Sequence, residues 1–153
     1  MTKVIKIAII GLGQVGNYLY RELNLKKKNI EIKSGKKIQI VALSAKNINK
    51  KRKYKINKKI FYTDPIKIIK KIKPDVLFEV IGQSDGVSKK LVETALKNKI
   101  HVITPNKALI SKHGNNLAKL AEKNNVNLEF EASVAGGIPI LRSIKEGLAT
   151  NKL

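Results

Sequence analysis

A short apolar segment that runs into a glycine-rich turn constrains the fold of this chain more than any other feature. Residues 4–10 are predicted to form a buried strand, and the segment G-L-G-Q-V-G follows at residues 11–16. An amphipathic helix is predicted over residues 14–25, because apolar residues recur there at helical spacing. A G-x-G-x-x-G turn between a strand and a helix brings the positive end of the helix close to a pyrophosphate, so the sequence predicts a dinucleotide site.

Each position of the turn has an expected part in that site. Gly11 permits the tight turn, Gly13 lets the backbone approach phosphate, and Gly16 lets the helix pack against the strand. Gln14 and Val15 lie in the first helical turn and are expected to contact the same cofactor. A glycine-rich turn that binds no ligand is the alternative interpretation.

Strand and helix patterns alternate along the rest of the chain. This alternation predicts an α/β fold of the Rossmann type, with a doubly wound, mostly parallel sheet covered on both faces. No repeat or linker interrupts the pattern, so residues 1–153 are expected to form a single dinucleotide-binding domain. Asp64 followed by Pro65 is typical of a helix start, and Ser84 or Asp85 is expected to cap the next helix. Further strands are expected at residues 38–43, 76–81, 100–104 and 126–131, helices at residues 65–73, 85–98, 115–124 and 139–149, and loops at residues 26–37 and 46–59.

The composition excludes several chemistries and bears on the choice of partner. The chain contains no cysteine, which excludes disulfides, thiolate metal sites and cysteine nucleophiles. No apolar run is long enough to span a membrane, and a cytoplasmic location is expected. The formal charge of +21 suggests nucleic acid as a partner, but only three of the basic residues are arginine, the type best suited to bases and phosphates. Nucleic-acid binding is therefore not favoured, whereas the positive field would attract an anionic cofactor.

The end of the second predicted strand bears on the choice between NAD(H) and NADP(H). An NAD site usually places a carboxylate there, bonded to the ribose 2′-hydroxyl, but residues 43–47 read L-S-A-K-N and hold none. Lys46 and Arg52 would instead attract a 2′-phosphate. We therefore expect NADP(H) to be favoured over NAD(H). The alternative is that both cations belong to a solvated, lysine-rich loop.

Two later segments resemble a known family. Residues 102–109 read V-I-T-P-N-K-A-L, and residues 130–139 read F-E-A-S-V-A-G-G-I-P. Together with the glycine turn and the segment V-I-G at residues 80–82, they resemble the nucleotide-binding domain of homoserine dehydrogenase, over nearly the whole chain. The resemblance implies an oxidoreductase of threonine and methionine biosynthesis, which interconverts L-homoserine and L-aspartate 4-semialdehyde by hydride transfer with NAD(P). It also implies that Gly82 lies at the cofactor.

The same resemblance implies two further sets of site residues. The lysine of the T-x-N-K-A segment, here Lys107, would lie at the junction of cofactor and substrate, where it could donate a hydrogen bond or carry a proton. A sodium ion would be bound largely by backbone carbonyls of Glu131, Val134, Gly136 and Ile138. The alternatives are that Lys107 is one more surface lysine, that Glu131 is an ordinary loop carboxylate, and that Gly136 and Gly137 form a simple turn before the helix at Pro139.

The predicted strand ends support those positions independently. Thr104 and Glu131 close predicted strands, and strand ends of a doubly wound sheet face the ligand crevice. The residues that follow them are therefore expected near the cofactor. His101 and His113 have no acidic or cysteine partner at motif spacing and are interpreted as structural or surface residues.

Full-length members of the family are homo-oligomers that continue into a substrate and dimerisation domain, which this sequence of 153 residues is expected to lack. Three hypotheses stay open. The chain is a truncated or split homoserine dehydrogenase that binds NADP(H) but turns over poorly or not at all alone, a non-catalytic NADP(H)-binding module that acts with a separate chain, or a basic nucleic-acid binder. Pro105 stands where many members carry a small residue and is expected to stiffen its loop.

Overall fold

The sheet has the strand order expected of a doubly wound fold. The structure is a computed structural model that describes residues 4–134, and the helix predicted at residues 139–149 lies outside them. Six strands pair in the order β3-β2-β1-β4-β5-β6, and every neighbouring pair is parallel. The predicted fold class is therefore confirmed. The strands are β1 (Val4–Ile10), β2 (Lys37–Ser44), β3 (Phe61–Tyr62), β4 (Val76–Glu79), β5 (His101–Ile103) and β6 (Leu128–Glu129).

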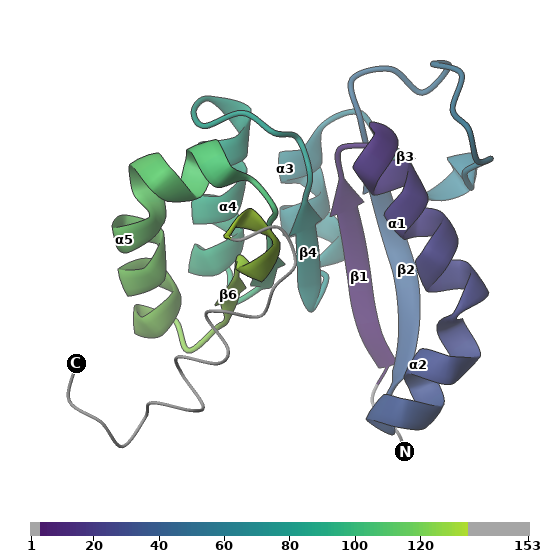
Figure 1. The fold of residues 1–153 in the computed structure, drawn as a ribbon, viewed down its shortest axis with the longest axis horizontal. Helices are drawn as coiled ribbons and strands as arrows, with labels where there is room; N and C mark the ends of the chain where they lie inside the picture. The colour runs from purple at the N-terminus through teal and green to yellow at the C-terminus, as the bar shows by residue number, and fades with distance from the viewer. Residues whose placement is uncertain (1–3, 135–153) are drawn as a thin grey trace.

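Helices cover both faces of the sheet (Figure 1). Ile7 and Ile9 of β1 pack in a cluster with side chains of α1 and α2, whereas Ala8 and Ile10 pack in a second cluster with α4 and α5. Successive side chains of a strand point to opposite faces, and burying each isoleucine contributes about 1.5–3 kcal/mol, so β1 is held from both sides. The helices are α1 (Gln14–Leu25), α2 (Lys27–Ser34), α3 (Pro65–Lys67), α4 (Val87–Lys97) and α5 (Lys107–Lys123), with short 3₁₀ or π segments η1 (Lys58–Ile60), η2 (Ile68–Ile72) and η3 (Glu131–Ser133).

Helix α2 occupies a segment predicted to be a loop, so that prediction is wrong. The helix follows α1 after the single residue Lys26 and ends at Ser34, and its C-cap residue Gly35 adopts a left-handed conformation. None of its residues is fully buried, and therefore no apolar periodicity marks it in the sequence. The side chain of Glu31 accepts a hydrogen bond from the N–H of Ile38 (2.9 Å), which ties the helix to the start of β2.

Helix α5 begins earlier than predicted. Its first residue is Lys107 rather than residue 115, because the side chain of Asn106 caps it by accepting a hydrogen bond from the N–H of Leu109 (3.1 Å). The earlier start places the lysine at the positive end of a helix that leaves the carboxyl end of β5.

The other two predicted helix starts had different outcomes. The expected cap of α4 by Ser84 or Asp85 is wrong, since no side chain caps that helix. The expected start at Asp64 is confirmed, because its carboxylate accepts a hydrogen bond from the N–H of Ile66 (2.9 Å). Beyond α3 the helix continues as the π segment η2.

Several strands are shorter than predicted. β4 ends at Glu79 and β6 ends at Glu129, so Glu131 begins η3 instead of closing a strand. The two-residue strand β3 was not predicted, because its apolar segment is too short to show a period. Among residues 4–134, no helix is long and apolar enough to cross a membrane.

Candidate functional site

A cleft of about 910 Å³ opens at the carboxyl ends of the central strands. Its walls come from three parts of the chain: the glycine turn with the first half of α1, the loop at residues 50–54, and the ends of β4, β5 and β6 with the start of η3. The volume lies in the range of small-molecule sites. Because β1 lies between β2 and β4, the cleft sits where the strand order reverses, which is the ligand position of open α/β sheets.

The glycine turn is shaped by close backbone contacts. Gly11 has a φ of 103°, and a Cβ on it would overlap the backbone carbonyl of Val80. A Cβ on Gly16 would overlap the backbone carbonyl of Gly11. Side chains at either position would therefore force α1 away from the ends of β1 and β4. The two glycines lie beneath the cleft and set the position of the helix.

The N-terminus of α1 is open toward the cleft. Gly13 is its N-cap residue, no side chain caps this end, and a Cβ on Gly13 would meet nothing within 4 Å. Gly13, Gln14 and Val15 all line the cleft. Uncapped N–H groups at the positive end of a helix form an anion site, so this arrangement can hold a diphosphate.

Arg52 lines the cleft but makes its hydrogen bonds to the backbone. Its Nε donates to the carbonyl of Leu12 (3.3 Å), and its two terminal nitrogens donate to three carbonyls of its own loop. The guanidinium thereby joins the loop to the glycine turn. The lysines on either side of it line the cleft as well: Lys50, Lys51 and Lys53.

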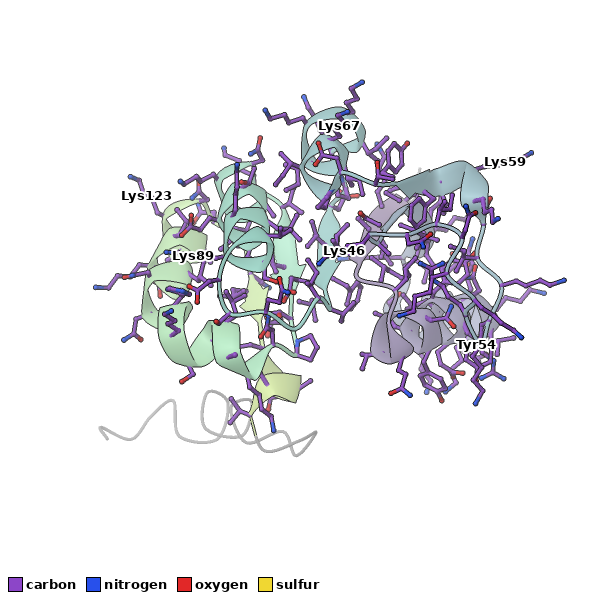
Figure 2. All side chains as sticks on the ribbon, turned by 90° about the horizontal axis from the view of Figure 1, so that it is seen from above. Lys46, Tyr54, Lys59, Lys67, Lys89 and Lys123 are labelled. Atoms are coloured by element: carbon purple, nitrogen blue, oxygen red, sulfur yellow. The ribbon has the colours of Figure 1, made fainter. Side chains whose placement is uncertain are left out.

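The remaining predicted contacts of the cofactor do not line the cleft. Lys46, Gly82 and Lys107 are exposed and are not among the described residues that line the cleft. Figure 2 shows Lys46 near the middle of the molecule, whereas Lys59 and Lys67 project at its periphery.

Asn17 is a site residue that sequence reasoning missed. Its side chain is only 4% exposed and makes two hydrogen bonds to the backbone of Tyr54: its amide nitrogen donates to the carbonyl, and its oxygen accepts from the N–H, both at 2.9 Å. This pair of hydrogen bonds holds residues 46–59, the lysine-rich loop, against α1. A polar residue on the inner face of a predicted amphipathic helix was the available signal.

Glu79 is a second missed residue, buried at the end of β4. Its carboxylate accepts hydrogen bonds from Ser88 (3.2 Å), Thr104 (2.6 Å) and Asn106 (3.3 Å), and from the N–H of Ile81 (2.9 Å). A charged residue within a buried strand was the available signal, because such residues are almost never fully buried without partners.

The predicted sodium ligands are described only in part. Glu131 and Val134 are described, and Glu131 lines the cleft, whereas Gly136 and Ile138 lie outside the described residues. The carbonyl of Glu131 accepts a hydrogen bond from the N–H of Val134 (3.0 Å), which curls this segment into η3. No group of three or more acidic or histidine side chains within residues 4–134 could hold a metal ion.

The two histidines contact partners far away in the sequence. His113 and Lys112 of α5 both contact Asp85 in the loop before α4, at 2.9 Å and 2.7 Å. The Lys112 ammonium, and then His113, hold the pKa of the Asp85 carboxyl well below its usual range. His101 accepts a hydrogen bond from the N–H of Asn127 (3.0 Å).

Comparison with known proteins shows the family of this chain. The family described as homoserine dehydrogenase, NAD binding domain, matches residues 11–131. The homoserine dehydrogenase of Neisseria gonorrhoeae is 36% identical over 99% of this chain and 34% of its own length. That of Bacillus subtilis is 35% identical over 99% of this chain and 35% of its own length. The chain therefore spans about a third of the length of these curated relatives.

Solved structures of homoserine dehydrogenases also resemble this chain. A crystal structure of S. aureus homoserine dehydrogenase at pH 7.5 superposes with a TM-score of 0.81 and 37% identity, over 88% of this chain and 34% of that one. The enzyme of Thiobacillus denitrificans superposes with a TM-score of 0.84 and 32% identity, over 98% of this chain and 34% of that one.

Alanine at Gly16 should lower the free energy of unfolding much more than alanine at Gly13 does. Gly16→Ala is expected to lower the free energy of unfolding by about 1–3 kcal/mol, because the new methyl group overlaps the Gly11 carbonyl. Gly13→Ala is expected to cost about 1 kcal/mol or less, since its Cβ meets nothing. Urea unfolding followed by circular dichroism measures both, and equal losses would contradict the packing role of Gly16.

Asn17→Ala should loosen the lysine-rich loop. Removing the side chain leaves the N–H and carbonyl of Tyr54 without these partners, which is expected to cost about 1–3 kcal/mol. Trypsin should then cut faster within residues 46–59. Asn24→Ala on the same helix is the matched control, because that exposed side chain bonds only to the carbonyl of Tyr20. Equal cleavage of both variants would contradict the role of Asn17.

Proposed function

Because this chain belongs to the family of homoserine dehydrogenases, through their NAD-binding domain, we propose that it binds a nicotinamide dinucleotide in the cleft and serves hydride transfer there. The observation that carries the proposal is the open N-terminus of α1. Gly11 and Gly16 bring it to the end of β1, and no side chain caps it. The diphosphate of the cofactor would accept hydrogen bonds from these N–H groups.

The strand order supports one direction for the bound cofactor. In a doubly wound fold the adenosine ribose lies at the end of the second strand, here β2. The nicotinamide half would then extend to the other side of β1, over the ends of β4 and β5. Thr104 and Pro105 line that part of the cleft.

The proposed reaction interconverts L-homoserine and L-aspartate 4-semialdehyde, a step in threonine and methionine biosynthesis. When bound, the nicotinamide supplies or accepts the hydride. Lys107 follows β5 and begins α5, so its ammonium would bond to the carbonyl oxygen of the semialdehyde or carry its proton. A cation at the positive end of a helix is electrostatically unfavourable, so helix stability does not account for this lysine.

We propose NADP(H) as the favoured cofactor. β2 ends at Ser44, and the residues that follow hold no carboxylate to repel a 2′-phosphate. Lys50, Lys51 and Lys53 line the cleft and would attract it, and Lys46, an exposed residue two positions after β2, would add to the positive field. Arg52 would support them by fixing the loop, since its guanidinium donates four hydrogen bonds to backbone carbonyls.

Three further features are proposed from the resemblance. A sodium ion would be bound by backbone carbonyls of Glu131 and Val134, together with Gly136 and Ile138. The enzyme would act in the cytoplasm. Its partner in the reaction would be a small amino acid.

NADPH should bind more tightly than NADH. A 2′-phosphate beside several lysines is expected to tighten binding about tenfold, measured by the fluorescence of each reduced cofactor during titration with the chain. Lys46→Gln and Lys51→Gln should each narrow this ratio about two- to fivefold, since each removes one partly exposed ion pair. Lys67→Gln, which changes an exposed lysine on α3, is the control. Tighter binding of NADH would contradict the preference.

Lys107→Met should test the proposed role of this lysine in the reaction. Homoserine-dependent reduction of NADP⁺ is expected to fall on the order of 100-fold, since proton transfer by a positioned side chain contributes this much. Lys123→Met, at the far end of the same helix, should retain the rate. An unchanged rate in Lys107→Met would contradict the role proposed for this lysine.

A further inference from the structure

The carboxylate of Glu79 lies under the nicotinamide side of the cleft but is not part of its wall. Its side chain is 0% exposed, at the end of β4. The hydrogen bonds to it come from four places in the chain: the turn after β4, the first helical turn of α4, the end of β5 and the cap of α5. None of the described residues bonded to it is a cation.

The directions of these hydrogen bonds require an acceptor at both carboxylate oxygens. The N–H of Ile81 donates to Oε1. The hydroxyl of Thr104 accepts from the N–H of Asn106 (3.1 Å) and donates to Oε2 of Glu79 (2.6 Å). The amide nitrogen of Asn106 donates to Oε2 as well. A glutamine would place an NH₂ group against one of these donors, so the site is specific for a carboxylate.

Two of the residues that donate to Glu79 also shape the cleft on the side of β4 and β5, where the nicotinamide is proposed to bind. Thr104 lines the cleft. Asn106 caps α5, immediately before Lys107, and its amide nitrogen also donates to the carbonyl of Gln83 (2.8 Å). One buried charge therefore joins the turn at residues 81–83 to the start of α5.

Stability alone does not explain a charge in this position. Burying a carboxylate without a cation is costly even when its hydrogen bonds are satisfied, and apolar residues could join β4 to β5 more cheaply. We propose that Glu79 is a positioning residue that holds Thr104 and the start of α5 in place for the nicotinamide half of the cofactor. This inference rests on the proposed function.

The test compares two ligands that share the adenosine half. NADPH carries the nicotinamide, whereas adenosine 2′,5′-bisphosphate lacks it. Glu79→Gln is expected to weaken NADPH binding about tenfold, the value of one charge-assisted hydrogen bond, and to change binding of the bisphosphate by less than about threefold. Fluorescence titration gives the dissociation constant of NADPH. Displacement of NADPH by the bisphosphate gives the dissociation constant of the bisphosphate. A merely structural role would weaken both ligands equally or neither.

Two further measurements keep the inference testable. Ile69→Val, in the fully buried core at η2, is the control: it should lower the urea midpoint and leave both dissociation constants unchanged. If Glu79→Gln does not fold, Thr104→Val and Thr104→Ser replace it. Thr104→Val removes the hydroxyl and should weaken binding of NADPH but not of the bisphosphate. Thr104→Ser keeps a hydroxyl and should bind NADPH as tightly as the unchanged chain does.

The outcomes are distinct. Selective loss of NADPH binding supports the inference. Equal effects on both ligands, or unchanged NADPH binding in Glu79→Gln, overturn it while the proposed function stands. Failure of the unchanged chain to bind NADPH overturns the proposed function, and this inference with it.

Discussion

The close approach of α1 to the ends of β1 and β4 is the constraint on which the rest of the site depends. It exists because Gly11 and Gly16 leave no Cβ between the helix and the carbonyls beneath it. With the helix in this position, its uncapped N-terminus opens into the cleft at the point where the strand order reverses. An anion placed there meets the positive end of the helix and several N–H groups together. The core around β1 supports this contact by packing both faces of the strand.

Two buried polar side chains extend that constraint to the two halves of the cleft. On the side of β2, Asn17 holds the lysine-rich loop through the backbone of Tyr54. On the side of β4 and β5, Glu79 holds Thr104 and the cap of α5. Both are satisfied by hydrogen bonds, as buried polar groups must be. The sheet therefore supplies the position of the cleft, and these two residues fix the loops that form its walls.

The sequence predicted the parts of this structure that depend on local pattern. The bounds of α1 were predicted because its apolar period and glycine turn lie within a short segment, and the central strands because their apolar runs are continuous. α2 was missed because nothing in it is fully buried. The roles of Asn17 and Glu79 were missed because their partners lie 37 and up to 27 residues away, which no local pattern records. The bounds of α5 depended on a cap by Asn106 that is itself held by Glu79.

Charge alone is a poor guide to the role of a residue in the lysine-rich loop. Arg52 is by type the strongest ligand for a phosphate, but its planar, rigid group also suits several fixed carbonyls at once, and there it makes four hydrogen bonds. Lysine is a flexible point charge that needs no fixed partner to attract an anion. The loop therefore divides the two tasks: its arginine fixes the backbone, and its lysines supply the field. A loop fixed in this way can hold those lysines beside the cleft without committing their own donors to the backbone.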